Sequence, residues 1–211
     1  MNGSTTFTGN LMAKKITPPG PGWAWHVRNR TRASYLYGIV FNWLAKQFTK
    51  LTGIPTLTAE LSVRKIGKDG TITDYGVVSY RVVTNAGVAF LIDDMDPAAT
   101  TDISTLKYHG CGTGATAENV TDTALVTEST TALNPDSTRA TGTATQPSAN
   151  ILTSTGTLTF DATAAITEHG LFSQAATGGG TLWDRSVFSA INVVNGDSIQ
   201  FAYSLTASAG G

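Results

Sequence analysis

The spacing of hydrophobic residues changes once along the chain, from a helical period to a period of two. Within residues 33–50, ASYLYGIVFNWLAKQFTK, one helical face would carry Leu36, Ile39, Val40, Trp43, Leu44 and Phe48. Lys46 and Lys50 suit the C-terminal turns of this helix, and Gly53 and Pro55 would end it. The pattern predicts a long amphipathic helix. We expect it to pack on its own domain, as most such helices do, with docking on a neighbouring molecule as the alternative.

Beyond Pro55 the chain is predicted to form short β-strands. Apolar and polar residues alternate over 57–63, so one face of this strand should be buried. Gly-Lys-Asp-Gly at 67–70 predicts a hairpin turn into a strand over 71–83, and 88–95 reads as a short helix. Further strands are expected over 106–112, 151–160, 165–172, 181–188 and 197–206, with exposed β or loop over 129–148. This pattern predicts a mainly β fold of the β-sandwich or jelly-roll type.

Residues 1–30 are predicted to form an extended basic arm. Pro18, Pro19 and Pro21, with the glycines between and after them, prevent regular structure there. Trp23 and Trp25 follow, and large aromatic residues either anchor interfaces or fold back onto a core. We therefore divide the chain into the arm (1–30), an amphipathic helix with its linker (31–56) and a β-sandwich domain (57–211).

The net charge of −1 conceals an uneven distribution of charges. Seven Lys and Arg residues and no acidic residue precede Glu60, so all fifteen acidic residues lie from Glu60 onwards. A basic segment of this kind suits an anionic partner, namely nucleic acid, a membrane or the acidic surface of another subunit. Because the cations are dispersed, we expect no direct contact with nucleic acid. The candidate partner-binding residues are Trp23, Trp25, Arg28, Arg30 and Arg32.

The composition favours a β protein that contacts other protein. Charged residues make up only 14% of the chain, against the usual quarter or so, and threonine is the commonest residue. Cys111 is the single cysteine, which excludes an intrachain disulfide and fits assembly in a reducing cytoplasm. We find no secretory signal pattern and no apolar run long enough to span a membrane. The expectation is a protein made in a cytoplasm, without a membrane association.

None of the familiar chemical motifs is complete, so we predict that the protein is not an enzyme and holds no metal or cofactor. The glycine-rich GCGTGAT at 110–116 lacks the Lys-Ser/Thr ending of a phosphate-binding loop. The acidic run at 93–96 lacks the ligand spacing of a calcium loop, and reads as an acidic helix end. His109 and Cys111 would share a strand face, but no orienting group accompanies them. Glu168 and His169 point to opposite faces, and one of them should reach Arg185 or a backbone amide.

Four segments follow one another in a fixed order: VVTNAGVAFLIDDM, LKYHGCGTGATAENVTDTALVTES, TLTFDATAAITEHGLFS and GGGTLWDRSVFSAINVVNGDSIQFAYSLT. This succession, over about residues 58–206, resembles a family of structural proteins of tailed-bacteriophage virions. The resemblance implies a virion β-sandwich of the kind used in head decoration, neck and tail proteins. Residues 1–56 have no counterpart in it.

Together these observations lead us to expect a capsid cement or decoration protein on the outer surface of a virion. It would bind the major capsid protein and copies of itself, as a dimer or trimer, and stabilise joints between capsomers. It would take no small-molecule substrate. One alternative is a tail or neck subunit that acts as an adaptor or attaches a fibre. The other is a carbohydrate-binding receptor module, with Trp183 as the stacking residue.

The arm yields a direct prediction. Deleting residues 1–30 should leave a folded domain that binds its target far more weakly, because the arm supplies cations and two tryptophans to the contact. Occupancy of the deletion protein on virions, compared with the full chain, measures this. Unchanged occupancy would contradict the role of the arm.

Overall fold

The computed structural model describes residues 40, 43, 44, 47, 55–80, 83–130 and 132–209 of the chain. The elements, in chain order, are β1 (Thr56–Ile66), β2 (Ile72–Ser79), α3 (Asn85–Asp94), the short 3₁₀ helix η1 (Ile103–Thr105), β3 (Tyr108–Gly112), β4 (Ala140–Thr141), β5 (Thr143–Ser148), β6 (Ile151–Thr159), β7 (Ala164–Phe172), β8 (Leu182–Val193) and β9 (Ser198–Ser208). The predicted mainly β fold is confirmed.

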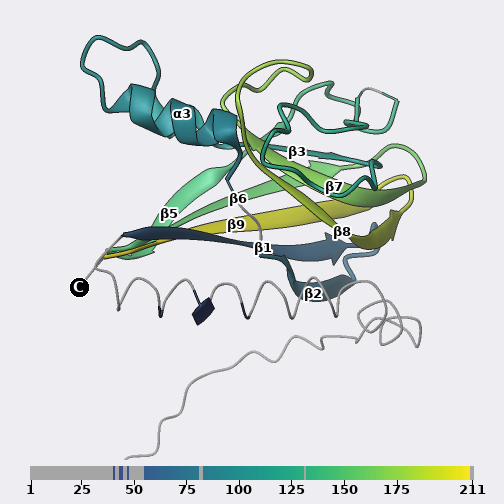
Figure 1. Cartoon of the computed structure of the whole chain (residues 1–211). Coiled ribbons are helices and arrows are strands. Elements are labelled where there is room, and N and C mark those ends of the chain that lie inside the picture. Colours follow the sequence, from purple (N-terminus) through teal and green to yellow (C-terminus); the bar gives the residue numbers. More distant parts are fainter. Residues whose placement is uncertain are drawn as a thin grey trace, which may run out of the picture.

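The strands form two antiparallel sheets (Figure 1). One sheet has five strands in the order β2-β1-β9-β6-β5, and the other has four in the order β4-β3-β7-β8. Apolar residues of both sheets belong to one buried core; Val63 and Phe201 come from the larger sheet, and Ile166 and Ile191 from the smaller one. The arrangement is compatible with the expected β-sandwich, whereas the jelly-roll topology stays a prediction.

Strand β8 is longer than the sequence pattern indicated. We expected it to end near residue 188, but it continues to Val193. The buried residues Phe188 and Ile191 are three positions apart, and the register between β7 and β8 shifts between Ile166 and Glu168. This irregularity breaks the period of two and hides the second half of the strand from pattern analysis.

Helix α3 is held tightly against β8. The hydroxyl of Thr84 accepts a hydrogen bond from the amide of Gly87 and donates one to the carbonyl of Leu182, at 3.0 and 2.6 Å. A Cβ at Gly87 would lie 2.8 Å from the carbonyl oxygen of Trp183. The predicted short helix is therefore confirmed, and Gly87 allows its first turn to approach the sheet so closely.

Before Pro55, the described residues Val40, Trp43, Leu44 and Gln47 are helical. Their apolar side chains are exposed, at 51% for Val40, 58% for Trp43 and 50% for Leu44. The expectation that this helix packs into its own domain is therefore wrong for these three residues. In the described parts of the chain, no helix combines the length and the hydrophobicity needed to cross a membrane.

Candidate functional site

The inner face of the five-stranded sheet runs from a buried region into an exposed apolar region. Alternate residues of β9 occupy this face, and Phe201 and Tyr203 are 0% and 3% exposed. The next inward position, Leu205, pairs with Ala59 on β1 and with Leu152 on β6, yet Leu152 is 48% exposed. Leu57, one row further out, is 45% exposed. We expected every inward-facing residue of 57–63 to be buried. The exposure of Leu57 shows that this expectation is wrong at the start of the strand.

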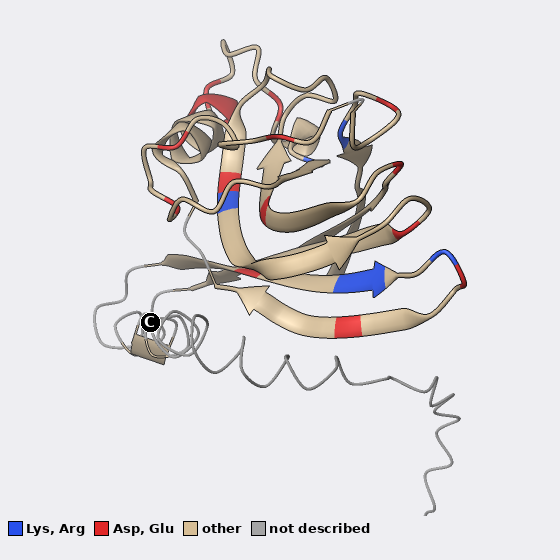
Figure 2. Cartoon of the chain, turned by 90° about the vertical axis from the view of Figure 1, so that its right-hand side faces the viewer, with Lys and Arg blue, Asp and Glu red and all other residues tan. Residues whose placement is uncertain are grey.

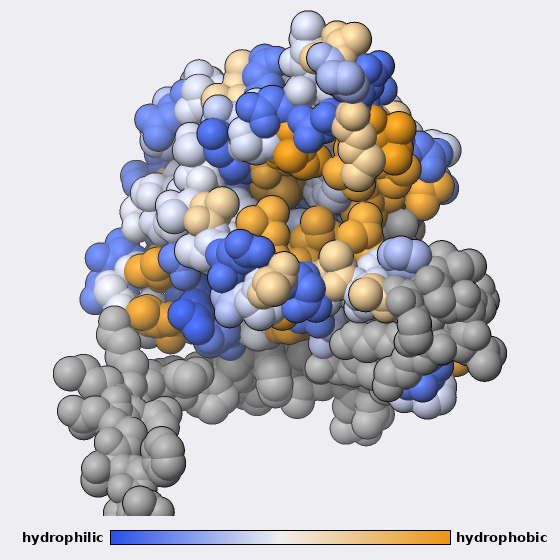
Figure 3. Space-filling model, turned by 90° about the vertical axis from the view of Figure 1, so that its left-hand side faces the viewer, coloured by the Kyte–Doolittle hydropathy of each residue, from blue (hydrophilic) through white to orange (hydrophobic). Residues whose placement is uncertain are grey.

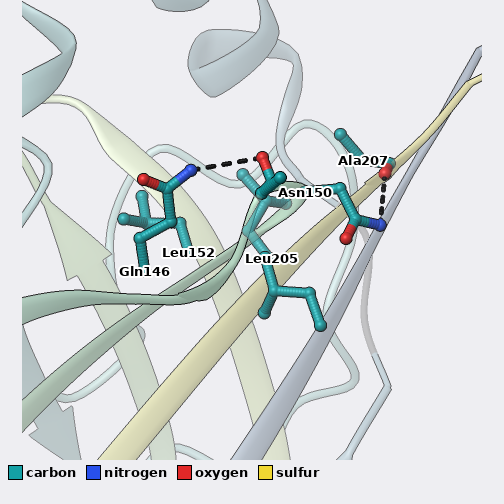
Figure 4. Close-up of a pocket in the computed structure, with 7 residues that line it drawn as sticks. Gln146, Asn150, Leu152, Leu205 and Ala207 are labelled. Atoms are coloured by element: carbon teal, nitrogen blue, oxygen red, sulfur yellow. Dashed lines mark hydrogen bonds between the residues drawn. The ribbon is translucent and has the colours of Figure 1, made fainter.

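The exposed end of this face forms a hollow of about 190 Å³. Its lining residues are Gln146, Ala149, Asn150, Ile151, Leu152, Leu205 and Ala207. Figure 4 shows Leu152 and Leu205 between the turn that joins β5 to β6 and the end of β9. We call these seven residues the hollow.

The chemistry of the hollow suits an apolar group. None of its lining residues is charged. Its two amide side chains already donate hydrogen bonds, Gln146 to the carbonyl of Ala149 at 3.2 Å and Asn150 to the carbonyl of Ala207 at 3.0 Å (Figure 4). Its volume is below that of usual small-molecule sites, which favours an inserted side chain as the occupant.

Further apolar side chains are exposed on α3 and directly after it: Val88, Ile92 and the C-cap residue Met95 are 48%, 59% and 71% exposed. Figure 3 shows hydrophobic residues gathered on the side of the molecule where α3 and the nearby strand ends lie. Acidic and basic residues are sparse on the broad strands, many of them lying in loops and turns (Figure 2). Exposed apolar side chains are therefore the main feature of this side of the described surface.

Three clusters of buried polar groups lie inside the protein, and the first is centred on Glu168. Glu168 is 0% exposed and accepts hydrogen bonds from the backbone amides of Gly114, Val126 and Thr127, at 3.0, 3.0 and 2.8 Å. It also pairs with the guanidinium of Arg185 at 2.9 Å. We predicted that either Glu168 or His169 would reach Arg185 or a backbone amide. Glu168 does so, and it contacts Arg185 as well as backbone amides.

Arg185 connects this carboxylate to the loop before β4. Its guanidinium also bonds to Asp122 at 2.9 Å and to the carbonyl of Thr116 at 3.1 Å. Although burial lowers the pKa of Arg185, the hydrogen bonds with Asp122 and Glu168 outweigh it and raise the pKa above its ordinary value. Arg185 therefore stays ionised, and its bonds fix the loop to the smaller sheet.

The glycines of GCGTGAT make room for this cluster. A Cβ at Gly114 would collide with a carboxylate oxygen of Glu168, and one at Gly112 would collide with the carbonyl of Thr127. The glycine-rich loop does bind an anionic group through a backbone amide, but that group is the protein's own carboxylate. The loop thus has an internal structural role.

His109 and His169 form a second buried cluster. Nδ1 of His109 lies 3.0 Å from Nε2 of His169, and Nε2 of His109 lies 2.9 Å from the hydroxyl of Ser154. Burial lowers the pKa of His109 to about 4. Burial and the neighbouring His109 also lower the pKa of His169 well below its ordinary value. Both rings are therefore neutral at physiological pH.

Cys111 is completely buried beside these histidines, opposite His169 in the ladder of β3 and β7. Burial, with the carboxylates of Glu128 and Glu168 nearby, raises the pKa of its thiol. The thiol stays protonated and out of contact with solvent, so it cannot serve as a nucleophile in this fold. The interpretation of Cys111 as a packing residue fits this geometry.

A third cluster fixes the threonine-rich stretch to the smaller sheet. Arg139 pairs with both carboxylate oxygens of Glu128, at 2.6 and 3.0 Å, and its guanidinium lies 3.4 Å from the centre of the Phe172 ring. It also donates to the carbonyls of Gln174 and Gly179. Pattern analysis could not reveal this pairing, because its two partners are eleven residues apart in an irregular segment.

The residues predicted to bind a partner, Trp23, Trp25, Arg28, Arg30 and Arg32, lie outside the described residues.

The acidic run does form a helix end: Asp94 accepts from the amide of Ile103, and Asp96 from that of Ala98. Within the ranges that the structure describes, no group of three or more His, Cys, Asp or Glu residues is placed to hold a metal ion. Sequence analysis did not predict the hollow, because the alternation of apolar and polar residues within a strand does not reveal where the opposite sheet ends.

Trp183 is buried, not exposed. It is 2% accessible, and its indole nitrogen donates to the hydroxyl of Tyr203 at 2.8 Å. A sugar could not stack on this ring. The feature that suggested a carbohydrate-binding module is therefore absent from the surface.

Comparison with known proteins identifies no relative: no family model, no curated protein and no solved structure matches the chain.

The substitution Glu168→Gln should destabilise the protein by about 3–5 kcal/mol, because it leaves Arg185 buried with a weaker partner and turns an amide group towards backbone N–H donors. Urea unfolding of the variant measures the loss. Glu60→Gln, on the exposed side of β1, is the matched control and should change the stability by less than about 0.5 kcal/mol. Equal effects of the two substitutions would show that the cluster is not central to the fold.

Stability should fall as the pH is lowered from about 6.5 towards 5. The folded protein holds the pKa of His109 at about 4, whereas the ordinary value is 6.5, so the unfolded chain binds a proton that the folded chain does not. This stability is fully present above pH 6.5 and is lost as the pH falls towards 4. Each histidine contributes at most about 1.4 kcal/mol per pH unit. Urea midpoints across this range should show the slope, and a His109→Gln/His169→Gln variant should lack it.

Proposed function

We propose that this protein is a structural subunit of a tailed-bacteriophage virion, in which it acts as a capsid cement or decoration protein. In this role a β-sandwich, with jelly-roll topology, binds the outer capsid surface and neighbouring copies of itself. The basic arm contacts the capsid, and the body bridges joints between capsomers.

The observation that carries this proposal is the uncovered apolar end of the five-stranded sheet. Leu57 and Leu152 continue the inner face of that sheet beyond the buried core, and both are nearly half exposed. An apolar surface of this kind gains stability when another protein covers it. The ordered sequence segments over about residues 58–206, which resemble those of virion proteins, support a capsid as the assembly that would do so.

The broad surface of the body supports the same role. Strand β5 lies at the edge of its sheet, and each of its six residues is exposed and uncharged. Pro147 lies where the pairing of β5 with β6 is irregular, and a proline in an edge strand limits uncontrolled strand addition. Such a surface can lie close to other subunits without the desolvation cost of burying charges.

The interior offers little for catalysis. The buried histidines are neutral and bonded to each other, the thiol of Cys111 is protonated, and the carboxylate of Glu168 is bound by three amides and Arg185. These groups stabilise the fold. We therefore propose a binding role and no enzymatic one.

Purified virions of the phage that encodes the chain test this proposal. A cement protein should be present at a copy number close to that of the major capsid protein, measured by quantitative gel or mass spectrometry. A few copies per particle would overturn the cement role in favour of a neck or tail subunit. Absence from the particle would overturn the virion assignment altogether.

A further inference from the structure

Two apolar surfaces of this chain are exposed at the same time. The first is the hollow, with Leu57 beside it: Leu57 opposes Ala207 in the pairing of β1 with β9, and Ala207 lines the hollow. The second is formed by Val40, Trp43 and Leu44, whose side chains are at least half exposed. Each surface is of the kind that the other could cover.

The second surface is one face of a helix. Val40, Trp43, Leu44 and Gln47 are all helical, and their spacing of three, one and three residues places them side by side. Three apolar side chains, one of them a tryptophan, therefore project together. A tryptophan with flanking aliphatic residues is the usual anchor of a helix that docks in an apolar groove.

We propose that the hollow receives this helical face from a second copy of the chain, with Trp43 as the anchor. The hollow has the apolar lining that such a face requires and contains no charged residue that would oppose it. Its volume of about 190 Å³ suits one inserted side chain better than a typical small molecule.

A second copy is favoured over the same chain for a direct reason. In the single chain, Val40, Trp43 and Leu44 remain exposed while Leu57 and Leu152 remain exposed as well, so the chain does not cover the hollow with this face. The helical residues precede β1, and β1 begins next to the hollow, at Thr56 opposite Ser208. A helical segment joined to the chain at this point can reach an adjoining copy whose hollow lies near the joint.

The exchange accounts for both exposed surfaces at once. Two copies that exchange helices reciprocally form a closed dimer, and copies that pass the helix around a ring form a closed trimer. The inference concerns contacts between copies of this chain, so it stands whether or not the protein belongs to a virion.

Cysteine pairs test which copy supplies the helix. Gln47→Cys places a thiol on the helical face while keeping Trp43, and Gln146→Cys places one at the hollow. Both positions are exposed, and the native Cys111 is completely buried. A mixture of the two single variants, mildly oxidised, should form a mixed disulfide dimer on a non-reducing gel, in excess over the homodimers of either variant alone.

The double variant separates the two arrangements. Intermolecular disulfides are expected, giving dimers or closed rings. A disulfide within one chain, seen as a faster monomer band that reduction abolishes, would overturn the exchange. Failure of the mixed variants to cross-link above the level of the single variants would overturn it as well.

Sedimentation equilibrium of the full chain measures the energetic side. Trp43→Ala and Leu152→Lys should each weaken self-association by about tenfold or more, because each removes an apolar contact at the proposed interface. Val194→Lys is the matched control. Val194 is 42% exposed and lies in the turn between β8 and β9, near the start of β9, whereas the hollow lies near the end of β9. Its substitution should leave association unchanged.

Thermal unfolding of the same proteins distinguishes lost association from lost folding. Leu152→Lys replaces a half-exposed side chain, so a dilute, dissociated sample should melt near the temperature of the wild type. A wild-type chain that is monomeric at all concentrations, or equal effects of Leu152→Lys and Val194→Lys on association, would overturn the proposal.

Discussion

The carboxylate of Glu168 occupies a position on which much of the smaller sheet depends. It lies in the middle of β7, completely buried, and its two oxygens take up three backbone amides and the guanidinium of Arg185. A buried charge is stable only when it is paired and hydrogen-bonded in this way. The loops that supply the amides are therefore fixed in place by the requirement to satisfy one carboxylate, and the glycines at 112 and 114 follow from the space it needs.

The three polar clusters share a structural logic. Glu168 with Arg185, Glu128 with Arg139, and His109 with His169 each join segments that are far apart in the chain or irregular in conformation. The first two fix the long connection between β3 and β4, which has little regular structure to hold it, and the histidine pair joins β3 to β7. These interior groups stabilise the fold, and the role that we propose for the protein is binding through its outer surface. The hollow is the part of that surface where inward-facing apolar residues of the five-stranded sheet are left exposed.

Much of the fold could be predicted because β-strand alternation is local. The strands at 56–66, 151–159, 164–172 and 198–208 agree closely with their predicted ranges, and the hairpin turn at 67–70 lies where the Gly-Lys-Asp-Gly sequence indicated. The prediction failed where the regular period is broken or where burial depends on another element. The register shift between β7 and β8 concealed the length of β8, and the exposure of Leu57 and Leu152 could not be read from a pattern that treats every inward position alike.

The sequence by itself determined the class of fold, the absence of an intrachain disulfide, and the division into a basic N-terminal region and an acidic remainder. Each of these depends on residue type and local spacing alone. Only the tertiary structure decided which acid meets Arg185, that Trp183 is buried, and where the apolar face of the larger sheet is left uncovered. The reason is physical: burial and ion pairing arise between residues that are distant in the chain, and the relative lengths and placement of two packed sheets, rather than the period within either one, decide which side chains meet.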